Sequence, residues 1–455
     1  MGVPLVVMCA VGLTPEHIGS DTPTLSALAQ AGRMEPLTPS LPAVTTTAQT
    51  TMLTGVAPQE HGIVGNGWYF HDLAEVWLWR QSEALVQAPL LWRDLRREDG
   101  QPLKVLKHFW WYAMNTSAQA TVTPRPVYHH DGRKSPDCYA FPPELKARIS
   151  EQHGTFPLFN FWGPVAGIAS SRWIAESFTT AFDHQQPDLS LVYLPHLDYD
   201  LQRFGPQGEH LAGNLADLDV CVRIVQEHAQ ARGAQVMIVS EYGLSAVDHG
   251  TYINRFLRQQ GYLSVTSNRA GELLDPGSSR AFAVCDHQLA HVYVPNPQDI
   301  ARVQAKLAEL PGIERCLSGD QRQEWGLNHP RSGDIVCMAE AGTWFCYDYW
   351  LEDARKPDFA HCVEIHKKPG YDPRELVFDP RGGKRRALYA LLRKKLGLRY
   401  TLNPVSLDDR LVRGSHGRPP ARPEEGPILI CPQPDVVPNQ PRQEDVAGII
   451  RALLS

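Results

Sequence analysis

The sequence predicts an α/β protein built on a doubly wound, mostly parallel sheet flanked by helices. Three apolar runs support this prediction, at residues 5–11, 189–194 and 236–240, since unbroken apolar stretches are typical of strands buried on both faces. An amphipathic helical pattern at residues 213–230 separates the last two runs. Apolar strands that alternate with helices form parallel sheets, whose ligand sites lie beyond the carboxyl ends of the strands. We therefore expect the loops that follow the three strands to converge.

The elements between these strands are predicted in chain order from their local patterns. They are a short helix at 24–32, strands at 76–79 and 105–109, a helix at 89–97, strands at 334–339 and 344–349 that pair as a hairpin, and a basic helix at 384–396. Each prediction rests on apolar periodicity and on the turn residues that border the pattern.

The residue composition of the chain changes in its middle part. From residue 110 to residue 172, aromatic residues, prolines and histidines interrupt the strand–helix alternation. We therefore divide the chain into a first core part at 1–109, a cap or insertion at 110–172 that lies over the site, and a second core part at 173–455. A proline-rich surface loop is the alternative for the middle part.

Composition and charge exclude some partners. The chain has 455 residues and a net charge of −6, which gives no basic field for a nucleic-acid polymer, so we expect a small-molecule partner. The nine cysteines are scattered and contain no CxxC pair, which fits a reducing compartment. The run at 5–11 is too short to span a bilayer and lacks a basic leader. We expect a cytoplasmic protein without a membrane partner, and the sequence leaves the oligomeric state open.

Residues 41–70 are the stretch around which the chemistry is organised. They contain a Thr-rich turn after a proline, a run compatible with a helix, a second turn at Thr54-Gly55 and a His-Gly/Asn-Gly loop. A helix N-terminus favours an anion because its backbone N–H groups are free and its dipole is positive there. A threonine hydroxyl at that point can meet a phosphate. Threonine is also favoured simply as a helix cap, so the local pattern leaves both roles open.

Fixed spacings in this stretch resemble the nucleophile segment of the nucleotide pyrophosphatase/phosphodiesterases, a family of the alkaline phosphatase superfamily. The matching positions are Pro42, Thr45, Thr54, Gly55, Pro58, His61, Gly62, Ile63 and Asn66. The resemblance implies an alkaline phosphatase-like fold in which Thr45 is the nucleophile and Asn66 contacts the phosphate.

Three later segments resemble the metal-binding loops of this family. Asp198 and Gln202 stand where the family has an aspartate and a histidine, and Glu241 and Tyr242 stand at a second such pair. His416, between two glycines, matches the late Gly-x-His-Gly motif. The resemblance implies a divalent metal, zinc foremost and as one or two ions, held by these five residues. Manganese and magnesium are the alternatives.

Several of these positions depart from the family pattern. The amide of Gln202 is a weaker zinc ligand than imidazole. Tyr242 either ligates as a phenolate or forms a hydrogen bond without touching the metal. A gapless reading places Val11 where the family has an aspartate ligand. Cys9, on the same face of that strand, is the nearest donor, although a buried cysteine more often only packs.

Other residues could add ligands or hold the substrate. The pairs Asp286-His287, near His291, and Asp248-His249 could compensate for the missing aspartate, although a histidine near a strand is usually structural. Lys367 and Lys368 lie beside glycine, tyrosine and acid at 365–372. These lysines could bind a phosphate or carboxylate of the substrate, or belong to an ordinary basic turn.

The resemblance implies a metal-dependent hydrolase of small phosphate esters, of the phosphodiesterase or nucleotide pyrophosphatase type, with a phospho-threonine intermediate at Thr45. A phosphomonoesterase or phosphonate hydrolase on the same fold is a variant of this hypothesis. The alternative from another class is a degenerate member that binds a phosphorylated ligand without turnover. Retention of Thr45 together with Asn66, Asp198 and His416 favours the enzyme, because a binder has no need of an aligned nucleophile.

Overall fold

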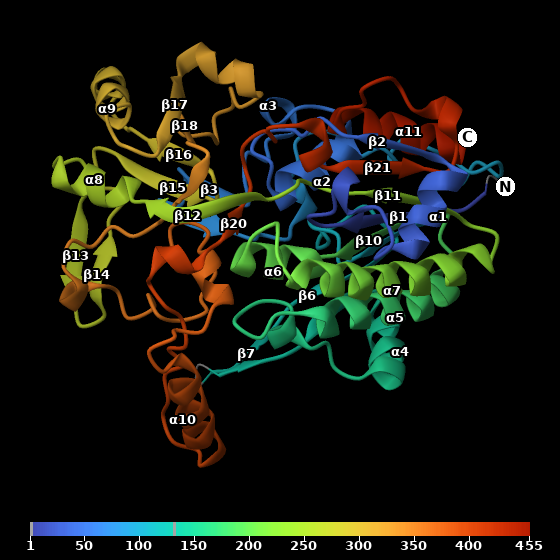
Figure 1. The fold of residues 1–455 in the computed structure, drawn as a ribbon, viewed down its shortest axis with the longest axis horizontal. Helices are drawn as coiled ribbons and strands as arrows, with labels where there is room; N and C mark the ends of the chain where they lie inside the picture. The colour runs from blue at the N-terminus through green and yellow to red at the C-terminus, as the bar shows by residue number, and fades with distance from the viewer. Residues whose placement is uncertain (1–2, 131–132) are drawn as a thin grey trace.

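The computed structural model describes residues 3–130 and 133–455 and has an eight-stranded sheet at its centre (Figure 1). In spatial order the strands are β2 (Arg33–Pro36), β21 (Ile428–Cys431), β11 (Gln235–Val239), β1 (Leu5–Ala10), β10 (Leu189–Leu194), β5 (Val105–His108), β6 (Ala120–Pro124) and β9 (Cys138–Phe141). The five strands from β11 to β6 run parallel, whereas β21 and β9 are antiparallel to their neighbours. This topology confirms the predicted mostly parallel sheet.

Strand β1 lies near the middle of the sheet because its side chains are apolar on both faces. All of its residues are buried. Helices α5 (Ile168–Gln185) and α7 (His210–Gln230) pack on one face, and α2 (Thr45–Thr54) and α11 (Val446–Leu454) lie over the other (Figure 1). Two helical layers leave no side of β1 in water, which explains its unbroken apolar sequence.

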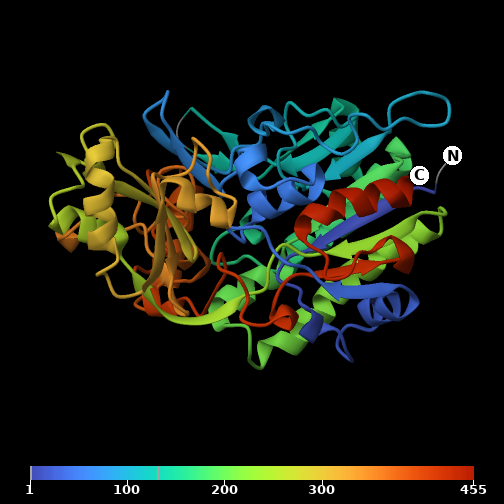
Figure 2. The ribbon, with the colours of Figure 1, turned by 90° about the horizontal axis from the view of Figure 1, so that it is seen from above.

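A second, smaller lobe is built on a four-stranded antiparallel sheet and lies to the left in Figure 2. Its strands, in spatial order, are β15 (Phe282–Asp286), β16 (Leu289–Tyr293), β18 (Ile335–Ala339) and β17 (Ile313–Ser318), with helices α8 (Ile253–Gln259) and α9 (Ile300–Leu307) nearby. Strand β12 (Ser245–Thr251) leads into this lobe and pairs with β19 (Gly342–Phe345). The predicted hairpin of 334–339 with 344–349 is therefore wrong, because β18 pairs with β16 and β17 instead.

The middle part of the chain, residues 110–172, is in part an extension of the main sheet. It supplies strands β6 and β9 at the sheet edge and helix α4 (Pro143–His153), which packs against β9 and α5. The loop after α4 lines the cleft described below. The segment predicted as a cap thus contains elements of the core and a wall of the site.

Residues 89–97 form turns and bends in place of the predicted helix. The side chains of Leu90, Leu91 and Trp92 are buried in the main core. The backbone N–H of Leu91 donates to the carbonyl of Leu53 at 2.9 Å. Packing against α2 thus overrides the local helical pattern.

Helix α10 (Gly383–Lys395) projects away from the two lobes at the bottom of Figure 1. It follows a long irregular stretch and carries many basic residues, as the sequence predicted. Within the described residues, no helix has both the length and the apolar character that crossing a membrane requires.

His108, on β5, is fully buried in the main core, and its imidazole makes the fold sensitive to acid. Its Nε2 atom lies 3.1 Å from the carbonyl oxygen of Ile174 and 3.0 Å from the Ser177 hydroxyl. Burial lowers the pKa of His108 to about 3. The unfolded chain binds a proton at this residue near the ordinary pKa of about 6.5. Stability contributed by the neutral imidazole is therefore lost as the pH falls from about 6.5 toward 3.

We expect the variant His108→Gln to lose less stability on acidification than the wild type. Glutamine retains an N–H donor but takes up no proton when the chain unfolds. The loss of unfolding free energy between pH 7 and pH 5 should be smaller by about 2 kcal/mol in the variant. Urea unfolding followed by tryptophan fluorescence at the two pH values measures this difference, and equal losses in both proteins would contradict the assignment.

Candidate active site

The segments after β1, β10 and β11 meet at the carboxyl end of the main sheet, as the sequence predicted. Asp198 lies in the first turn of α6 (His196–Phe204), directly after β10, while Glu241 and Tyr242 directly follow β11. The Cys9 thiol on β1 donates to Glu241 Oε1 at 3.5 Å, and the Tyr242 hydroxyl donates to Asp198 Oδ1 at 3.4 Å. Residues far apart in the sequence thus form one buried polar cluster.

Helix α2 begins at Thr45 and is buried from there to Leu53. A threonine-rich helix can be buried because its hydroxyls find backbone partners. The Thr46 hydroxyl donates to the Gly65 carbonyl at 2.8 Å, and the Thr50 hydroxyl donates to the Thr46 carbonyl at 2.7 Å. Thr45 differs, since its Oγ1 atom lies 3.2 Å from the Tyr242 hydroxyl and lines a cleft. The first hydroxyl of the helix is therefore the one presented for chemistry.

The acidic side chains of this cluster are buried, and burial controls their protonation. It raises the pKa of Asp198 to about 7 and the pKa of Glu241 to about 8. The pKa of the Tyr242 phenol is raised well above its usual value for the same reason. Gln202 Nε2 donates to Asp198 Oδ2 at 2.6 Å, which favours the ionised carboxylate.

Asn66 is fixed beside the start of α2. Its Oδ1 atom accepts a hydrogen bond from the backbone N–H of Thr46 at 3.1 Å. Its own backbone N–H and its Nδ2 atom donate to the two carboxyl oxygens of Asp286, at 2.8 Å and 3.1 Å. The predicted phosphate contact therefore lies next to Thr45, held by a carboxylate from the smaller lobe.

His416 reaches the cluster through the two-residue strand β20 (Gly414–Ser415), which pairs with the start of β12. A Cβ atom at Gly414 would lie 2.1 Å from the carbonyl oxygen of Leu201, so only glycine lets β20 approach α6. His416 Nδ1 donates to the Ala43 carbonyl at 2.7 Å. Its Nε2 atom lies 3.9 Å from Asp198 Oδ1. Burial lowers the pKa of His416 well below its usual range, so the imidazole is neutral.

Four aromatic rings, two of them from the polar cluster just described, form a continuous stack. The ring centroids are 3.5 Å apart for Tyr242 and His416, 3.6 Å for His416 and His287, and 3.8 Å for His287 and Tyr371. The Asp286-His287 pair, predicted only as a source of spare ligands, thus lies inside the site. His291 instead contacts the Val64 carbonyl, and Asp248-His249 lies exposed on the surface.

Gln49 and Tyr371 are site residues that sequence reasoning missed. Gln49 Nε2 donates to Glu241 Oε1 at 2.6 Å, and the Tyr371 hydroxyl donates to Gln202 Oε1 at 3.0 Å. Gln49 could have been found, because it lies one helical turn after Thr45 and so shares its face of the helix. The position of Tyr371 depends on the tertiary fold and has no local signal.

Two of the predicted donors fit a divalent metal. Among the residues that the structure describes, no group of three or more His, Cys, Asp or Glu side chains is arranged to hold one. Asp198 and His416 nevertheless fit a single cation with further ligands, since His416 Nε2 is buried without a hydrogen-bond partner in the described structure and faces the carboxylate.

The second predicted metal position fits poorly. Val11 offers no donor atom, and the Tyr242 hydroxyl already contacts Thr45 and Asp198. Burial raises the pKa of the Cys9 thiol well above its usual value, so Cys9 is a thiol that donates to Glu241 instead of a thiolate ligand. Glu241 Oε1 is held by Gln49, while its Oε2 atom is buried without a hydrogen-bond partner in the described structure and is available as a donor.

Both lysines predicted to bind substrate lie outside the lining of the cleft. Lys368 is 1% exposed, and its Nζ atom lies 2.8 Å from Asp372 Oδ2 and 2.6 Å from Glu375 Oε1. Lys367 is exposed on the surface. The structure thus gives Lys368 a structural role, because two buried carboxylates already occupy its ammonium group.

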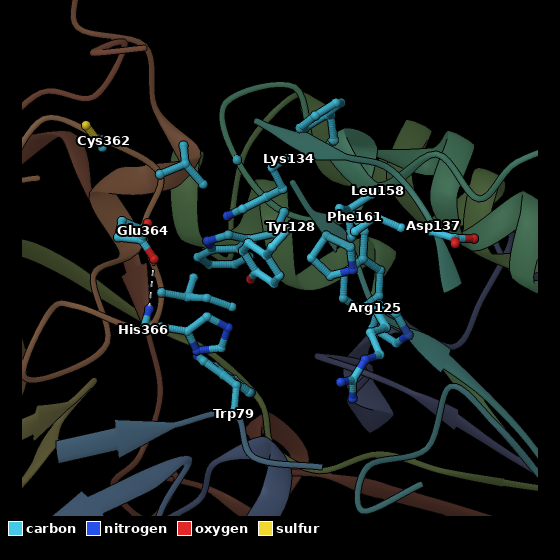
Figure 3. Close-up of a pocket in the computed structure, with 18 of the residues that line it drawn as sticks. Trp79, Arg125, Tyr128, Lys134, Asp137, Leu158, Phe161, Cys362, Glu364 and His366 are labelled. Carbon is cyan, nitrogen blue, oxygen red and sulfur yellow. Dashed lines mark hydrogen bonds between the residues drawn. The ribbon is translucent and has the colours of Figure 1, made fainter. Parts of the chain in front are cut away.

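A cleft of about 2890 Å³ leads from Thr45, Asp198, Tyr242 and His416 to the surface. Its outer part runs between the segment of Glu364 and His366 on one side and that of Leu158 and Phe161 on the other, with Tyr128 and Lys134 between them (Figure 3). Aromatic side chains are frequent along its walls. The cleft therefore joins a polar floor to a largely apolar channel.

Comparison with known proteins gives one family and a set of related folds. The family model described as "Type I phosphodiesterase / nucleotide pyrophosphatase" matches residues 5–372. No curated protein matches the chain. Phosphonoacetate hydrolase from Sinorhizobium meliloti 1021, in complex with phosphonoformate, aligns with a TM-score of 0.62 and 14% identity, over 100% of this chain and 96% of that chain.

Two further structures are similar at lower scores. Murine ectonucleotide pyrophosphatase / phosphodiesterase 5, in an inactive form in complex with AMP, gives a TM-score of 0.56 and 13% identity, over 100% of this chain and 95% of that chain. The human protein of the same name gives 0.57 and 12%, over 99% and 94%. At these identities the likeness shows a shared fold.

We expect Lys368→Met to destabilise the protein by about 3–5 kcal/mol, because it leaves the buried Glu375 carboxylate without a cation and removes one of the two cations beside Asp372, which keeps Arg374. Lys367→Met, the matched control one residue earlier, should change stability by less than about 0.5 kcal/mol. Urea unfolding of both variants measures the difference. A stable Lys368→Met that binds substrate weakly would instead support the contact predicted from the sequence.

Proposed function

The chain belongs to the type I phosphodiesterase / nucleotide pyrophosphatase family, and from this membership we propose that it is a metal-dependent hydrolase of small phosphate diesters that acts through Thr45. One observation carries the proposal. Thr45 Oγ1 lies 3.2 Å from the Tyr242 hydroxyl, which lies 3.4 Å from Asp198 Oδ1, at the floor of a cleft. Two similar structures are complexes with phosphonoformate and AMP, both small phosphorus ligands, which supports a phosphate group at this floor.

Thr45 is the nucleophile in this proposal. Its oxygen attacks phosphorus, the ester oxygen of the leaving group departs on the opposite side, and a phospho-threonine forms. The Tyr242 hydroxyl lies between Thr45 Oγ1 and Asp198 Oδ1 and orients the attacking oxygen, while the Thr45 proton passes to water in the cleft, because Asp198 Oδ1 faces the cation position. Water then cleaves the phospho-threonine and restores the hydroxyl.

The start of α2 and Asn66 stabilise the phosphoryl group. The N-terminal end of a helix offers N–H groups and positive dipole charge to an anion. Asn66 Nδ2 carries a second N–H besides the one donated to Asp286. A divalent cation bound between Asp198 and His416, zinc foremost, would supply the positive charge that phosphate oxygens need in the transition state.

A non-catalytic role is the second candidate, favoured by the replacement of family ligands at Val11 and Tyr242. In that case the floor binds a phosphorylated ligand and does not turn it over. We also propose a cytoplasmic location, which the nine free cysteines support.

Thr45→Ala should reduce hydrolysis of bis(p-nitrophenyl) phosphate by at least about 10³-fold, since removal of a nucleophile costs this much or more in other hydrolases. Thr54→Ala, at the far end of the same helix, is the matched control and should retain activity, because the Thr54 hydroxyl donates to the Thr50 carbonyl and Thr54 is not among the described residues that line the cleft. Release of p-nitrophenol measures both. Full activity in Thr45→Ala would exclude it as nucleophile.

Removal of metal with a chelator should abolish hydrolysis, and zinc, manganese or magnesium should restore it. We expect about one bound cation per chain, since the second position fits poorly. His416→Ala should weaken metal binding by at least about tenfold, because it removes one of two protein donors. Metal analysis and titration measure both quantities. A protein that carries no metal and gains no activity with any of these ions would have the non-catalytic, ligand-binding role instead.

A further inference from the structure

Helix α10 and the turns around it carry a concentrated positive charge. In a chain of net charge −6, residues 381–400 contain eight basic residues and no acidic residue. The basic residues are Arg381, Lys384, Arg385, Arg386, Arg393, Lys394, Lys395 and Arg399. Arg386 is engaged with Asp379 and with the Asn403 carbonyl, whereas Lys384, Arg385, Lys394 and Lys395 are exposed.

The same helix turns leucines toward solvent. Leu388, Leu392 and Leu396 are spaced by four residues and so lie along one face. They are 70%, 53% and 64% exposed, whereas Ala390 on the other side of the helix is buried. A helix that served only to pack on the body would turn its leucines inward. The exposed row of leucines is therefore available to a partner outside the described chain.

The apolar surface continues around the outer end of the cleft. Leu391 and Leu398 line the cleft and are 54% and 49% exposed. Tyr128, Phe159 and Val165, from the middle part of the chain, line the same cleft and are 59%, 45% and 51% exposed. Lys394 and Lys395, on the helix that projects in Figure 1, line it too, so exposed apolar and basic side chains lie along one cleft.

We propose that α10 docks on the surface of an anionic lipid bilayer. The leucines enter the boundary between head groups and acyl chains, while the exposed lysines and arginines contact lipid phosphates. An anionic bilayer binds helices that carry both basic and exposed apolar side chains. The proposal does not depend on hydrolysis at Thr45. It departs from the expectation of no membrane partner, which rested on the absence of a spanning segment.

Other occupants fit the surface less well. Pairing of α10 with α10 in a second copy would oppose two clusters of like charge, which is unfavourable. A nucleic-acid polymer would meet the basic residues but leave the leucines in water. An anionic bilayer satisfies both sets of side chains at once.

The test is co-sedimentation of the full chain with vesicles. We expect binding to vesicles of equal parts phosphatidylcholine and phosphatidylglycerol at low ionic strength, at least about tenfold tighter than to phosphatidylcholine alone and weakened by salt. Lys394→Glu combined with Lys395→Glu, and Leu388→Ser combined with Leu392→Ser, should each weaken this binding by at least about tenfold.

Matched controls change exposed or half-buried residues of the same kinds elsewhere. Arg223→Glu with Lys306→Glu, on α7 and α9, and Leu351→Ser should bind vesicles as the wild type does. Circular dichroism checks that every variant is folded. The proposal is overturned by absence of binding to the anionic vesicles, by α10 variants that bind as the controls do, or by a concentration-dependent dimer that the leucine variant abolishes.

Discussion

The hydrogen bond between Gln49 and Glu241 is the contact on which the site depends. It joins the first turns of α2 to the end of β11 at 2.6 Å, and Gln49 Oε1 also accepts from the backbone N–H of Trp111 at 2.8 Å. On the other side of Glu241, its backbone carbonyl accepts from Gln443 Nε2 at 2.7 Å. Since Thr45 lies one turn before Gln49, this link fixes where its hydroxyl lies relative to the sheet.

The protein buries carboxyl groups in two different ways. At the site, Asp198, Glu241 and Asp286 have pKa values raised by burial to about 7, 8 and 6. In the smaller lobe, Asp372 and Asp348 instead form ion pairs with Arg374, at 2.7 Å and 2.5 Å. The carboxylates beside Arg374 are already neutralised by its charge. The carboxyl groups at the site are not, so a positive charge that enters the cleft would stabilise their ionised forms.

Much of the fold was predictable because its signals are local. The start of α2 at Thr45 and its end at Gly55, whose φ of +74° suits glycine, follow from neighbouring residues. The central strands followed from apolar runs. The predicted hairpin at 334–349 was wrong because strand pairing depends on residues far apart in the lobe. The predicted helix at 89–97 was wrong because this segment packs against α2, where the Leu91 N–H donates to the Leu53 carbonyl.

The candidate site was predictable only in part. Asp198, Tyr242 and His416 came from motif spacing, and the structure brings them together with Thr45. The contact that holds Asn66 was not accessible in the same way, since Asn66 and Asp286 are separated by 220 residues. For Lys368 the local pattern showed glycine, tyrosine and an acid nearby, but it did not show that Asp372 and Glu375 both hold the lysine ammonium group in the interior.

The stack of Tyr242, His416, His287 and Tyr371 has a consequence for how the protein adapts to what it binds. Both faces of the His416 imidazole are covered by rings, at 3.5 Å and 3.6 Å. The ring cannot swing about its Cβ–Cγ bond unless a neighbour leaves first. Its Nε2 lone pair therefore keeps one direction, so an incoming molecule must conform to a rigid receptor.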